Sequence, residues 1–247
     1  MECLISKKHS LKTEDYENLI RGKNVAIVGS AAYLEGYQYG KSIDEHDLII
    51  RINRGCEVIE GKHEILGSRT DILYSCLIEQ KENAGNWNKK MFVEDYGLKY
   101  LCTMPESSMK GISSGTRLHG MVDKQKYSRL SKELPCRIVD SDFFTSLALE
   151  VGCRPTTGYT AIYDILRFRP ESLTIHGFDF FYSGWFSGYK NGTKKSANEL
   201  WVDTLNSKRH KHKNMWGHCK RLLNNPAVNI DEHLQKVLSI DEWWFKK

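Results

Sequence analysis

Two threonines and a glycine stand where a phosphate could bind. In "PTTGYTAIYDI" (Pro155–Ile165), Thr156, Thr157 and Gly158 precede apolar residues that are spaced as on one face of a helix. The first turn of a helix leaves backbone N–H groups without partners, and together with hydroxyl groups they suit an anion. The alternative is ordinary capping of the helix by Thr156 or Thr157, with no ligand. This segment is therefore a candidate phosphate site that needs support from elsewhere in the chain.

Three histidines lie in a basic segment toward the C-terminus. The segment "NSKRHKHKNMWGHCKRL" (206–222) contains His210, His212 and His218. Histidine is the usual general base for a hydroxyl group, because it changes charge near neutral pH. Metal binding is less favoured, since the surrounding lysines and Arg209 would repel a cation. The alternative to a catalytic role is a solvated basic loop.

A pair of carboxylates suggests a metal site. In "VDSDFF" (139–144), Asp140 and Asp142 follow a predicted strand, in the Asp-x-Asp pattern that holds a divalent metal against a sugar diphosphate in many glycosyltransferases. Hard cations prefer such oxygen ligands. The alternative is a turn in which Asp142 caps the helix that begins at Phe143. Elsewhere, "VGSAAYLEG" (28–36) is neither G-x-G-x-x-G nor a P-loop, which disfavours a dinucleotide-dependent oxidoreductase.

Alternating strands and helices must position these groups. The apolar patterns predict strands at Asn24–Gly29, His46–Asn53, Thr70–Cys76, Leu98–Met104, Cys136–Asp140 and Ser172–Phe181, and helices at Thr13–Arg21, Asp123–Glu133, Phe143–Val151, Gly158–Phe168 and Trp216–Leu223. This alternation indicates a doubly wound α/β sheet, which binds ligands at the carboxyl ends of its strands. The residues expected at that edge are Gly29, Ser30, Asn53, Arg54, Asp140 to Asp142, Thr157, Gly158 and Gly177 to Asp179.

The composition is that of one ordinary globular unit. The chain has 247 residues, of which 40% are hydrophobic and 27% charged, and we expect a single domain over 1–247. No apolar run approaches the roughly 18 residues of a membrane span. The N-terminal apolar run is also too short for a signal peptide, so we expect a cytoplasmic protein or a fragment whose anchor has been removed. Seven scattered cysteines without a C-x-x-C pair indicate reduced thiols and not a disulfide framework or a zinc site. Much of the net charge of +5 lies in 206–222, where nucleic acid, an acidic membrane surface or a phosphorylated substrate could bind.

Two stretches of the chain resemble the sialylmotifs of the glycosyltransferase family 29 sialyltransferases. "NVAIVGSAAYLEGYQYGKSIDEHDLIIRIN" (24–53) resembles the large motif in its first strand, its glycine-containing loop, its "IDEHD" and its second strand ending in Arg-x-Asn. "RPTTGYTAIYDILRFRPESLTIHGFDFF" (154–181) resembles the small motif, from Pro-Thr-Thr-Gly through to Gly-Phe. "GSRTDILY" (67–74) also fits the run between the motifs. The two motifs in this order are more specific than either is alone.

The resemblance implies a fold, a donor and a site. The fold would be a single-domain, Rossmann-like α/β structure, a mostly parallel doubly wound sheet flanked by helices, in a GT-A-like sialyltransferase variant. The donor would be CMP-sialic acid or CMP-Kdo and the acceptor a glycan, with no metal cofactor and no nucleic-acid partner. The nucleotide-binding residues on matching positions would be Gly29, Ser30, Asn53, Thr156, Thr157, Gly158 and Gly177. His212 would be the general base of an inverting transfer, with His210 as second choice, and aromatic residues of 180–189 would stack on the acceptor sugar.

The chain departs from the two motifs at several positions. The large motif usually has Asn where Ser30 and Tyr33 stand. The cysteine pair that joins the motifs in secreted members is absent, and Val25 and Pro170 lie near those positions, as expected for a bacterial or viral type of member. Gly217, five residues after His212, stands where the family's very small motif has Glu.

Three other functions remain as alternatives. The first is a metal-dependent glycosyltransferase that binds a nucleotide-diphosphate sugar through Asp140 and Asp142. The second is a nucleic-acid-binding protein that uses 208–221, which would show a steep salt dependence. The third is a CMP-binding relative without activity. Peripheral contact of the basic segment with a membrane is compatible with the transferase.

Overall fold

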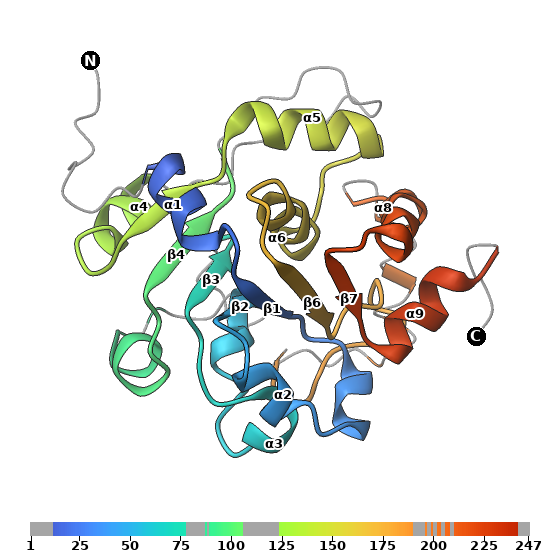
Figure 1. The fold of residues 1–247 in the computed structure, drawn as a ribbon, viewed down its shortest axis with the longest axis horizontal. Helices are drawn as coiled ribbons and strands as arrows, with labels where there is room; N and C mark the ends of the chain where they lie inside the picture. The colour runs from blue at the N-terminus through green and yellow to red at the C-terminus, as the bar shows by residue number, and fades with distance from the viewer. Residues whose placement is uncertain are drawn as a thin grey trace.

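A single parallel sheet organises the chain. The computed structural model describes residues 12–77, 87, 89–105, 124–189, 196, 199, 202, 203, 206, 207 and 210–241. Within them the strands form a 7-stranded sheet of order β5-β4-β3-β2-β1-β6-β7, and every neighbouring pair is parallel (Figure 1). The strands are β1 (Asn24–Val28), β2 (Leu48–Ile52), β3 (Ile72–Ser75), β4 (Tyr100–Thr103), β5 (Cys136–Ile138), β6 (Ser172–His176) and β7 (Val228–Ile230). The order confirms the predicted doubly wound sheet.

The winding of the sheet reverses at β1. Strand β2 pairs with one edge of β1, with Val25 opposite Leu48, and β6 pairs with the other, with Val25 opposite Leu173. The chain runs from β1 outward to β5 and then returns to form β6 beside β1. A ligand crevice is expected where the connections after two neighbouring strands leave in opposite directions. The carboxyl ends of β1 and β6 are therefore where a site should lie.

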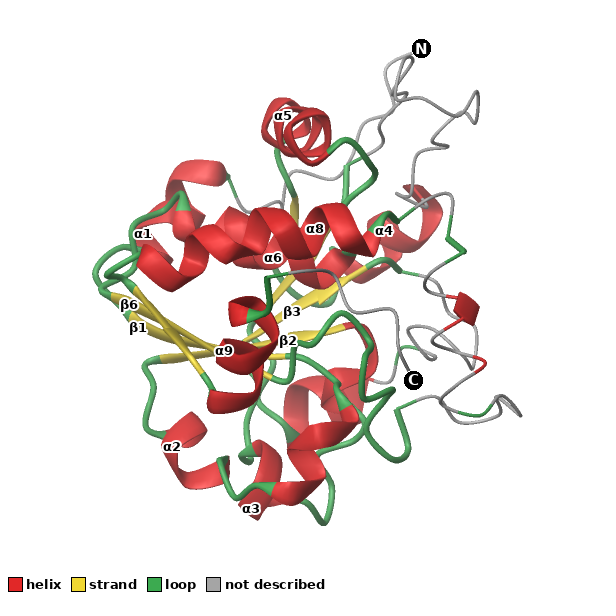
Figure 2. Ribbon diagram, turned by 90° about the vertical axis from the view of Figure 1, so that its right-hand side faces the viewer, coloured by secondary structure: helices red, strands yellow, loops and turns green. Residues whose placement is uncertain are grey.

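Helices cover both faces of the sheet (Figure 2). Helices α1 (Thr13–Ile20), α5 (Ser141–Val151), α6 (Thr157–Leu166) and α8 (His212–Cys219) lie on one face, and α2 (Gly40–Asp44) and α3 (His63–Leu66) lie on the other. The remaining helical segments are a π-helical turn at Lys90–Asp95, α4 (Lys124–Leu130), α9 (Glu232–Ser239) and 3₁₀ turns at Ala32–Gly36, Asn53–Cys56 and Lys220–Asn224. Because both faces are covered, β1 and β2 are buried along almost their whole length, which explains their continuous apolar sequences.

Most predicted elements are present, with differences in the C-terminal part. The six predicted strands and the first four predicted helices all have a counterpart within a few residues. Helix α8 begins at His212, whereas the predicted helix began at Trp216. Strand β7 and helix α9 were not predicted, and the three residues "VNI" of β7 are too few to show a pattern.

Several charged residues of the large motif hold the fold together. The Asp44 carboxylate accepts hydrogen bonds from the Ser68 N–H and hydroxyl groups at 2.9 Å. Arg51 is buried and donates to the Thr70 hydroxyl at 2.9 Å and to the Leu66 carbonyl at 2.5 Å. These contacts tie the chain between the motifs to β2, which explains the presence of "GSRTDILY" between them.

A buried ion pair anchors α6 to the sheet. The Asp164 carboxylate, which is fully buried, accepts hydrogen bonds from Arg137 Nη1 at 2.5 Å and Nη2 at 3.1 Å. The same carboxylate accepts from the Tyr74 hydroxyl at 2.7 Å and from Arg167 Nε at 2.8 Å. Arg137 comes from β5 and Tyr74 from β3, so this one carboxylate fixes α6 above two strands.

Candidate functional site

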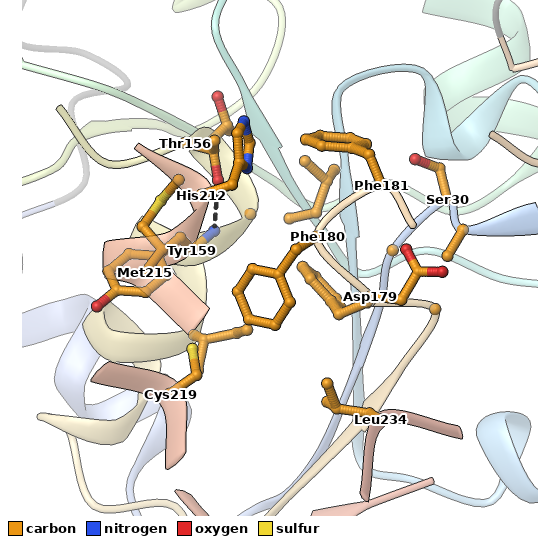
Figure 3. A pocket seen from close by; sticks show the side chains of 18 of the residues that line it. Ser30, Thr156, Tyr159, Asp179, Phe180, Phe181, His212, Met215, Cys219 and Leu234 are labelled. Atoms are coloured by element: carbon orange, nitrogen blue, oxygen red, sulfur yellow. Dashed lines mark hydrogen bonds between the residues drawn. The ribbon is translucent and has the colours of Figure 1, made fainter. Parts of the chain in front are cut away.

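A pocket lies at the reversal of the sheet. It contains about 820 Å³ of open space and is bounded by the carboxyl ends of β1, β2 and β6, by the start of α6 and by α8 and α9 (Figure 3). Every residue predicted to bind the nucleotide lines it: Gly29, Ser30, Asn53, Thr156, Thr157, Gly158 and Gly177. His212 lines it as well, and His210 is not among its lining residues. The structure thus brings together residues that are up to 183 positions apart, from Gly29 to His212.

Glycines bring the ends of β1 and β6 into close contact. The Gly29 N–H donates to the His176 carbonyl at 2.8 Å, and the Ala31 N–H donates to the Gly177 carbonyl at 3.1 Å. A Cβ atom on Gly29 would lie 2.2 Å from the Gly177 carbonyl oxygen. Gly177 itself has a φ of 74°, a conformation that favours glycine. The two glycines therefore let the ends of β1 and β6 meet at backbone distance, and this contact, which lines the pocket, is called the glycine floor below.

The start of α6 offers two free backbone N–H groups to the pocket. Thr156 is the N-cap, and its hydroxyl accepts the Tyr159 N–H at 3.3 Å (Figure 3). The Thr157 and Gly158 N–H groups donate to no residue in the described part of the chain. Gly158 also allows close packing, because a Cβ there would lie 2.7 Å from the Phe178 ring. Thr156 thus has the capping role that we considered, and it leaves the next two N–H groups available for an anion.

Strained backbone surrounds the pocket. Asn53, Phe180 and Phe181 line it and have φ values of 50°, 59° and 68°, which residues other than glycine seldom adopt. The Asn53 side-chain oxygen accepts the Cys76 N–H at 3.0 Å, which turns its amide group across the end of β2. Such strain persists only where the surrounding structure enforces it, and it concentrates at functional sites.

A buried tyrosine closes the pocket beside Ser30 and Asn53. The Tyr189 hydroxyl donates to the Ile52 carbonyl at 3.3 Å. Burial raises the pKa of Tyr189 to about 12, and its contacts with the Ser30 and Asn53 side chains oppose that rise. Tyr189 belongs to the aromatic segment 180–189. Its hydroxyl contacts the side chains of Ser30 and Asn53, which are predicted to bind the nucleotide.

The three histidines have different environments. His212 is the first residue of α8, is only 7% exposed, and meets the Phe181 ring edge-to-face at 5.2 Å. Burial, and to a lesser degree the neighbouring His210, lower the pKa of His212 to about 3, so its ring is neutral at pH 7. His210 Nδ1 lies 2.8 Å from the Arg154 carbonyl. His218 Nδ1 lies 2.5 Å from the Tyr159 hydroxyl, and its Nε2 lies 3.1 Å from Glu150. Only His212 of the three is placed to meet a ligand in the pocket.

Asp179 is a carboxylate in the pocket to which the sequence alone assigned no role. It is 1% exposed, and its Oδ2 accepts the Ser183 N–H at 2.8 Å and lies 3.5 Å from His233 Nε2. Its Oδ1 is buried and has no hydrogen-bond partner in the described part of the chain. Figure 3 shows Asp179 on the same side of the pocket as Ser30. A buried carboxylate oxygen without a partner costs free energy unless a ligand supplies a donor.

The far end of the pocket is apolar. The lining residues there that sequence reasoning missed are Ile162, Met215, Cys219, Leu222, Leu234 and Leu238. They come from α6, α8, the turn after α8, and α9. Their spacing is that of ordinary core residues, so no signal in the sequence distinguishes them from the rest of the core.

The pair Asp140 and Asp142 lies outside the pocket. Asp140, and not Asp142 as we considered, caps α5, since its Oδ1 accepts the Phe143 N–H at 2.9 Å. Asp142 is exposed in the first turn of that helix. Neither residue lines the pocket, and over the described residues no three His, Cys, Asp or Glu side chains come together as metal ligands. Lys208 and Arg209 of the basic segment lie outside the described residues.

The buried histidines should make the protein less stable in acid. Burial lowers the pKa of His176 to about 4 and that of His212 to about 3, whereas an unfolded histidine titrates near 6.5. Below about pH 6.5 the unfolded chain therefore binds more protons than the folded one, and the free energy of unfolding falls as the pH decreases toward 4. Urea unfolding at pH 7.5 and pH 5 should show this loss, and His176→Gln should reduce it.

Exposed His63 provides the control for this prediction. His63→Gln should leave the difference in unfolding free energy between pH 7.5 and pH 5 unchanged. An equal pH dependence in the wild type and in His176→Gln would show that His176 does not contribute.

The chain is similar to known proteins in sequence and in fold. The model of glycosyltransferase family 29 (sialyltransferase) matches residues 3–182. Among solved structures, a mammalian sialyltransferase in complex with Gal-β-1-3GalNAc-ortho-nitrophenol is 16% identical, with a TM-score of 0.56 over 90% of this chain and 74% of that one. The monofunctional α-2,3-sialyltransferase Cst-I from Campylobacter jejuni is 11% identical, with a TM-score of 0.53 over 91% and 78%. CstII from the same organism, in complex with cytidine-5'-monophosphate, is 15% identical, with a TM-score of 0.50 over 85% and 80%. The comparison with curated protein sequences gave no match.

Proposed function

Because this chain belongs to glycosyltransferase family 29, and is thus a sialyltransferase-type enzyme that uses a CMP-sugar donor, we propose an inverting, metal-independent transfer of sialic acid or Kdo to a glycan hydroxyl. One observation carries the proposal: the pocket at the sheet reversal is lined by the Thr157 and Gly158 N–H groups, which have no partner among the described residues, by the glycine floor and by a neutral histidine. These are the groups that a departing phosphate and an attacking hydroxyl require.

The donor would lie across the reversal of the sheet. Its phosphate would accept hydrogen bonds from the Thr157 and Gly158 N–H groups, where the partial positive charge of the start of α6 also favours an anion. The cytidine would lie over the backbone of Gly29 and Gly177, which both line the pocket. The buried Asp179 Oδ1 would accept a ribose hydroxyl, which supplies the donor that this oxygen lacks.

The reaction would break the bond between the anomeric carbon and the phosphate oxygen, with both electrons leaving on CMP. The acceptor hydroxyl would attack the positively charged carbon from the opposite side, and His212 would take its proton. Burial keeps His212 neutral but also weakens it as a base, and the negative charge of the donor phosphate would raise its pKa back toward the working pH. The two N–H groups of α6 would stabilise the phosphate, each worth roughly 3–4 kcal/mol if it acts as an oxyanion-hole donor does.

The test is release of CMP from CMP-sialic acid in the presence of EDTA, with and without a panel of glycan acceptors. Release that depends on an acceptor and survives EDTA would support the proposal. Release abolished by EDTA and restored by a divalent metal would show that the transfer needs a metal. CMP binding without release would point to the inactive relative. The same assay includes CMP-Kdo as a second donor. Absence of both binding and release with either donor would contradict the proposal.

The phosphate site can be tested by removing one backbone N–H group. Thr157 is the first residue of α6, and Thr156 before it has φ −72° and ψ 162°, so Thr157→Pro suits the local backbone. Thr157→Pro removes the N–H and the hydroxyl, whereas Thr157→Ala removes the hydroxyl alone. We expect Thr157→Pro to lower kcat by a factor of about 100 to 1,000 relative to Thr157→Ala. Equal kcat values for the two variants would show that this N–H does not stabilise the leaving group.

The state of the cysteines supports a reducing compartment. Six of the cysteines, all buried, are free thiols, and Cys3 lies outside the described residues. Disulfides are expected to form in oxidising compartments and not in the cytosol, and we propose a cytoplasmic location on this basis. In the described part of the chain no helix is long and apolar enough to cross a membrane.

A further inference from the structure

Tyr33 connects three parts of the molecule behind the pocket. It lies in the 3₁₀ turn that follows β1 (Ala32–Gly36), and its backbone N–H donates to the Ser183 hydroxyl at 3.1 Å. Its own hydroxyl donates to Asp231 and accepts the Gly177 N–H at 2.8 Å. Its ring stacks on the His233 ring, with centroids 3.8 Å apart and planes 13° apart. Tyr33 does not line the pocket, but Ser183 and His233 lie against Asp179, Gly177 begins the turn that carries it, and Asp231 contacts Gly177.

The hydroxyl contacts fix the turn that carries Asp179. Gly177 begins this turn, and its N–H is held by the Tyr33 hydroxyl and, at 3.3 Å, by Asp231 Oδ2. Asp231 is itself immobilised as the N-cap of α9, because its other oxygen accepts the Leu234 N–H at 2.8 Å. The turn after β6 is thereby attached to the start of α9 both directly, through Asp231 Oδ2, and through the Tyr33 hydroxyl.

The ring contact fixes the other neighbour of Asp179. His233 Nε2 lies 3.5 Å from Asp179 Oδ2, and stacking on Tyr33 sets the orientation of the His233 ring. The Ser183 N–H holds the same carboxylate oxygen at 2.8 Å. With Oδ2 held in this way, Oδ1 remains as the oxygen without a partner.

We propose that Tyr33 is a positioning residue of the donor site, which holds the Gly177–Asp179 turn and the His233 ring so that Asp179 Oδ1 meets the donor ribose. This inference rests on the proposed function, because it takes the pocket to be the CMP site. It predicts that Tyr33 controls recognition of the ribose hydroxyl groups without touching the nucleotide.

The experiment measures the Kd of CMP and of its 2′-deoxy and 3′-deoxy analogues by calorimetry. The wild type should bind CMP about tenfold more tightly than the analogue that lacks the hydroxyl facing Asp179, since hydrogen bonds to charged groups are the stronger ones. Tyr33→Phe keeps the ring stacking and removes the hydroxyl. We expect it to bring this Kd ratio close to 1, with the Kd of CMP raised about tenfold. A purely structural role would weaken CMP and both analogues equally and would leave the ratio unchanged.

Tyr37 and Asp231 provide the comparisons. Tyr37→Phe makes the same change at the end of the same turn, where the hydroxyl makes no hydrogen bond to a described residue, and should preserve the ratio. Asp231→Asn retains a capping residue for α9 but replaces an acceptor of the Tyr33 hydroxyl and the Gly177 N–H. Asp231→Asn should lower the ratio of the Kd of the analogue to the Kd of CMP. In the double variant with Tyr33→Phe, this Kd ratio should be no lower than in the single variant that has the larger effect.

Each outcome distinguishes this inference from the proposed function. Wild-type protein that does not bind CMP would contradict the proposed function itself. Two outcomes would overturn the role of Tyr33 and leave the transferase proposal standing. In the first, the wild type binds CMP no more tightly than either analogue. In the second, the preference for CMP persists in both Tyr33→Phe and Asp231→Asn.

Discussion

Replacing His212 with alanine is expected to lower kcat for sialyl transfer by a factor of about 100 to 10,000, the usual contribution of a general base. His212 lines the pocket at the start of α8, and its ring is neutral because burial lowers its pKa to about 3. Without the imidazole, the acceptor hydroxyl would have to lose its proton to water as it attacks. The measurement is acceptor-dependent release of CMP at saturating donor.

The binding of CMP should separate a lost base from a damaged site. The His212 imidazole makes no hydrogen bond to another residue in the described ranges, so its removal should leave the donor contacts of α6 and β1 in place. We therefore expect the Kd of CMP in His212→Ala to stay within a factor of about 3 of the wild type, since the imidazole takes part in none of the proposed donor contacts.

His210→Ala is the matched control for this prediction. His210 is two residues away and belongs to the same basic segment, but it does not line the pocket and its Nδ1 is engaged with the Arg154 carbonyl at 2.8 Å. We expect His210→Ala to retain most of the activity. If His212→Ala were active and His210→Ala inactive, His210 would be the base, and α8 would have to move when the substrates bind.

The pair of histidines shows how far the sequence could define the site. Gly29, Asn53 and Gly177 were predictable, because each lies at or directly after the end of an apolar strand and the ends of parallel strands share one edge. The choice between His210 and His212 followed from no such pattern. It depends on where α8 begins, and this start is set by packing of Met215 and Trp216 into the core.

The contacts behind the pocket were beyond sequence reasoning for a different reason. Tyr33 and Asp231 are 198 residues apart, and neither type of residue in its local sequence suggests the other as a partner. Strand β7 and helix α9, which carry Asp231 and His233 toward the pocket, are short elements whose position is fixed by pairing of β7 with β6 and by packing of α9 into the core. The order of the sheet had to be known before that side of the site could be described.

The burial of Asp164 could not be predicted from the sequence either. In the sequence it appears as a polar residue on an amphipathic helix, where exposure to solvent would be expected. The structure instead buries it completely against Arg137, Tyr74 and Arg167. Removal of this carboxylate would leave the buried guanidinium of Arg137 without a counter-charge.

Replacing Asp164 with alanine is therefore expected to lower the free energy of unfolding by about 3–5 kcal/mol. The Arg137 guanidinium would remain buried beneath the Tyr16 and Phe168 rings with no acceptor for two of its N–H groups. Urea unfolding, compared at equal slope, measures the loss. Asp142→Ala, an exposed carboxylate in the first turn of neighbouring α5, should change the unfolding free energy by less than about 0.5 kcal/mol.

The same variant should affect function through the position of α6. Asp164 and the Thr157 and Gly158 N–H groups, which we propose bind the phosphate, belong to one helix of 10 residues, so a helix that tilts at Asp164 also displaces its first turn. We expect folded Asp164→Ala, measured without urea, to bind CMP more weakly than Asp142→Ala does. If Asp164→Ala were as stable as the wild type, the buried Arg137 would have found another partner. If the variant were destabilised but bound CMP as the wild type does, the glycine floor of β1 and β6, and not the ion pair, would hold the start of α6 in place.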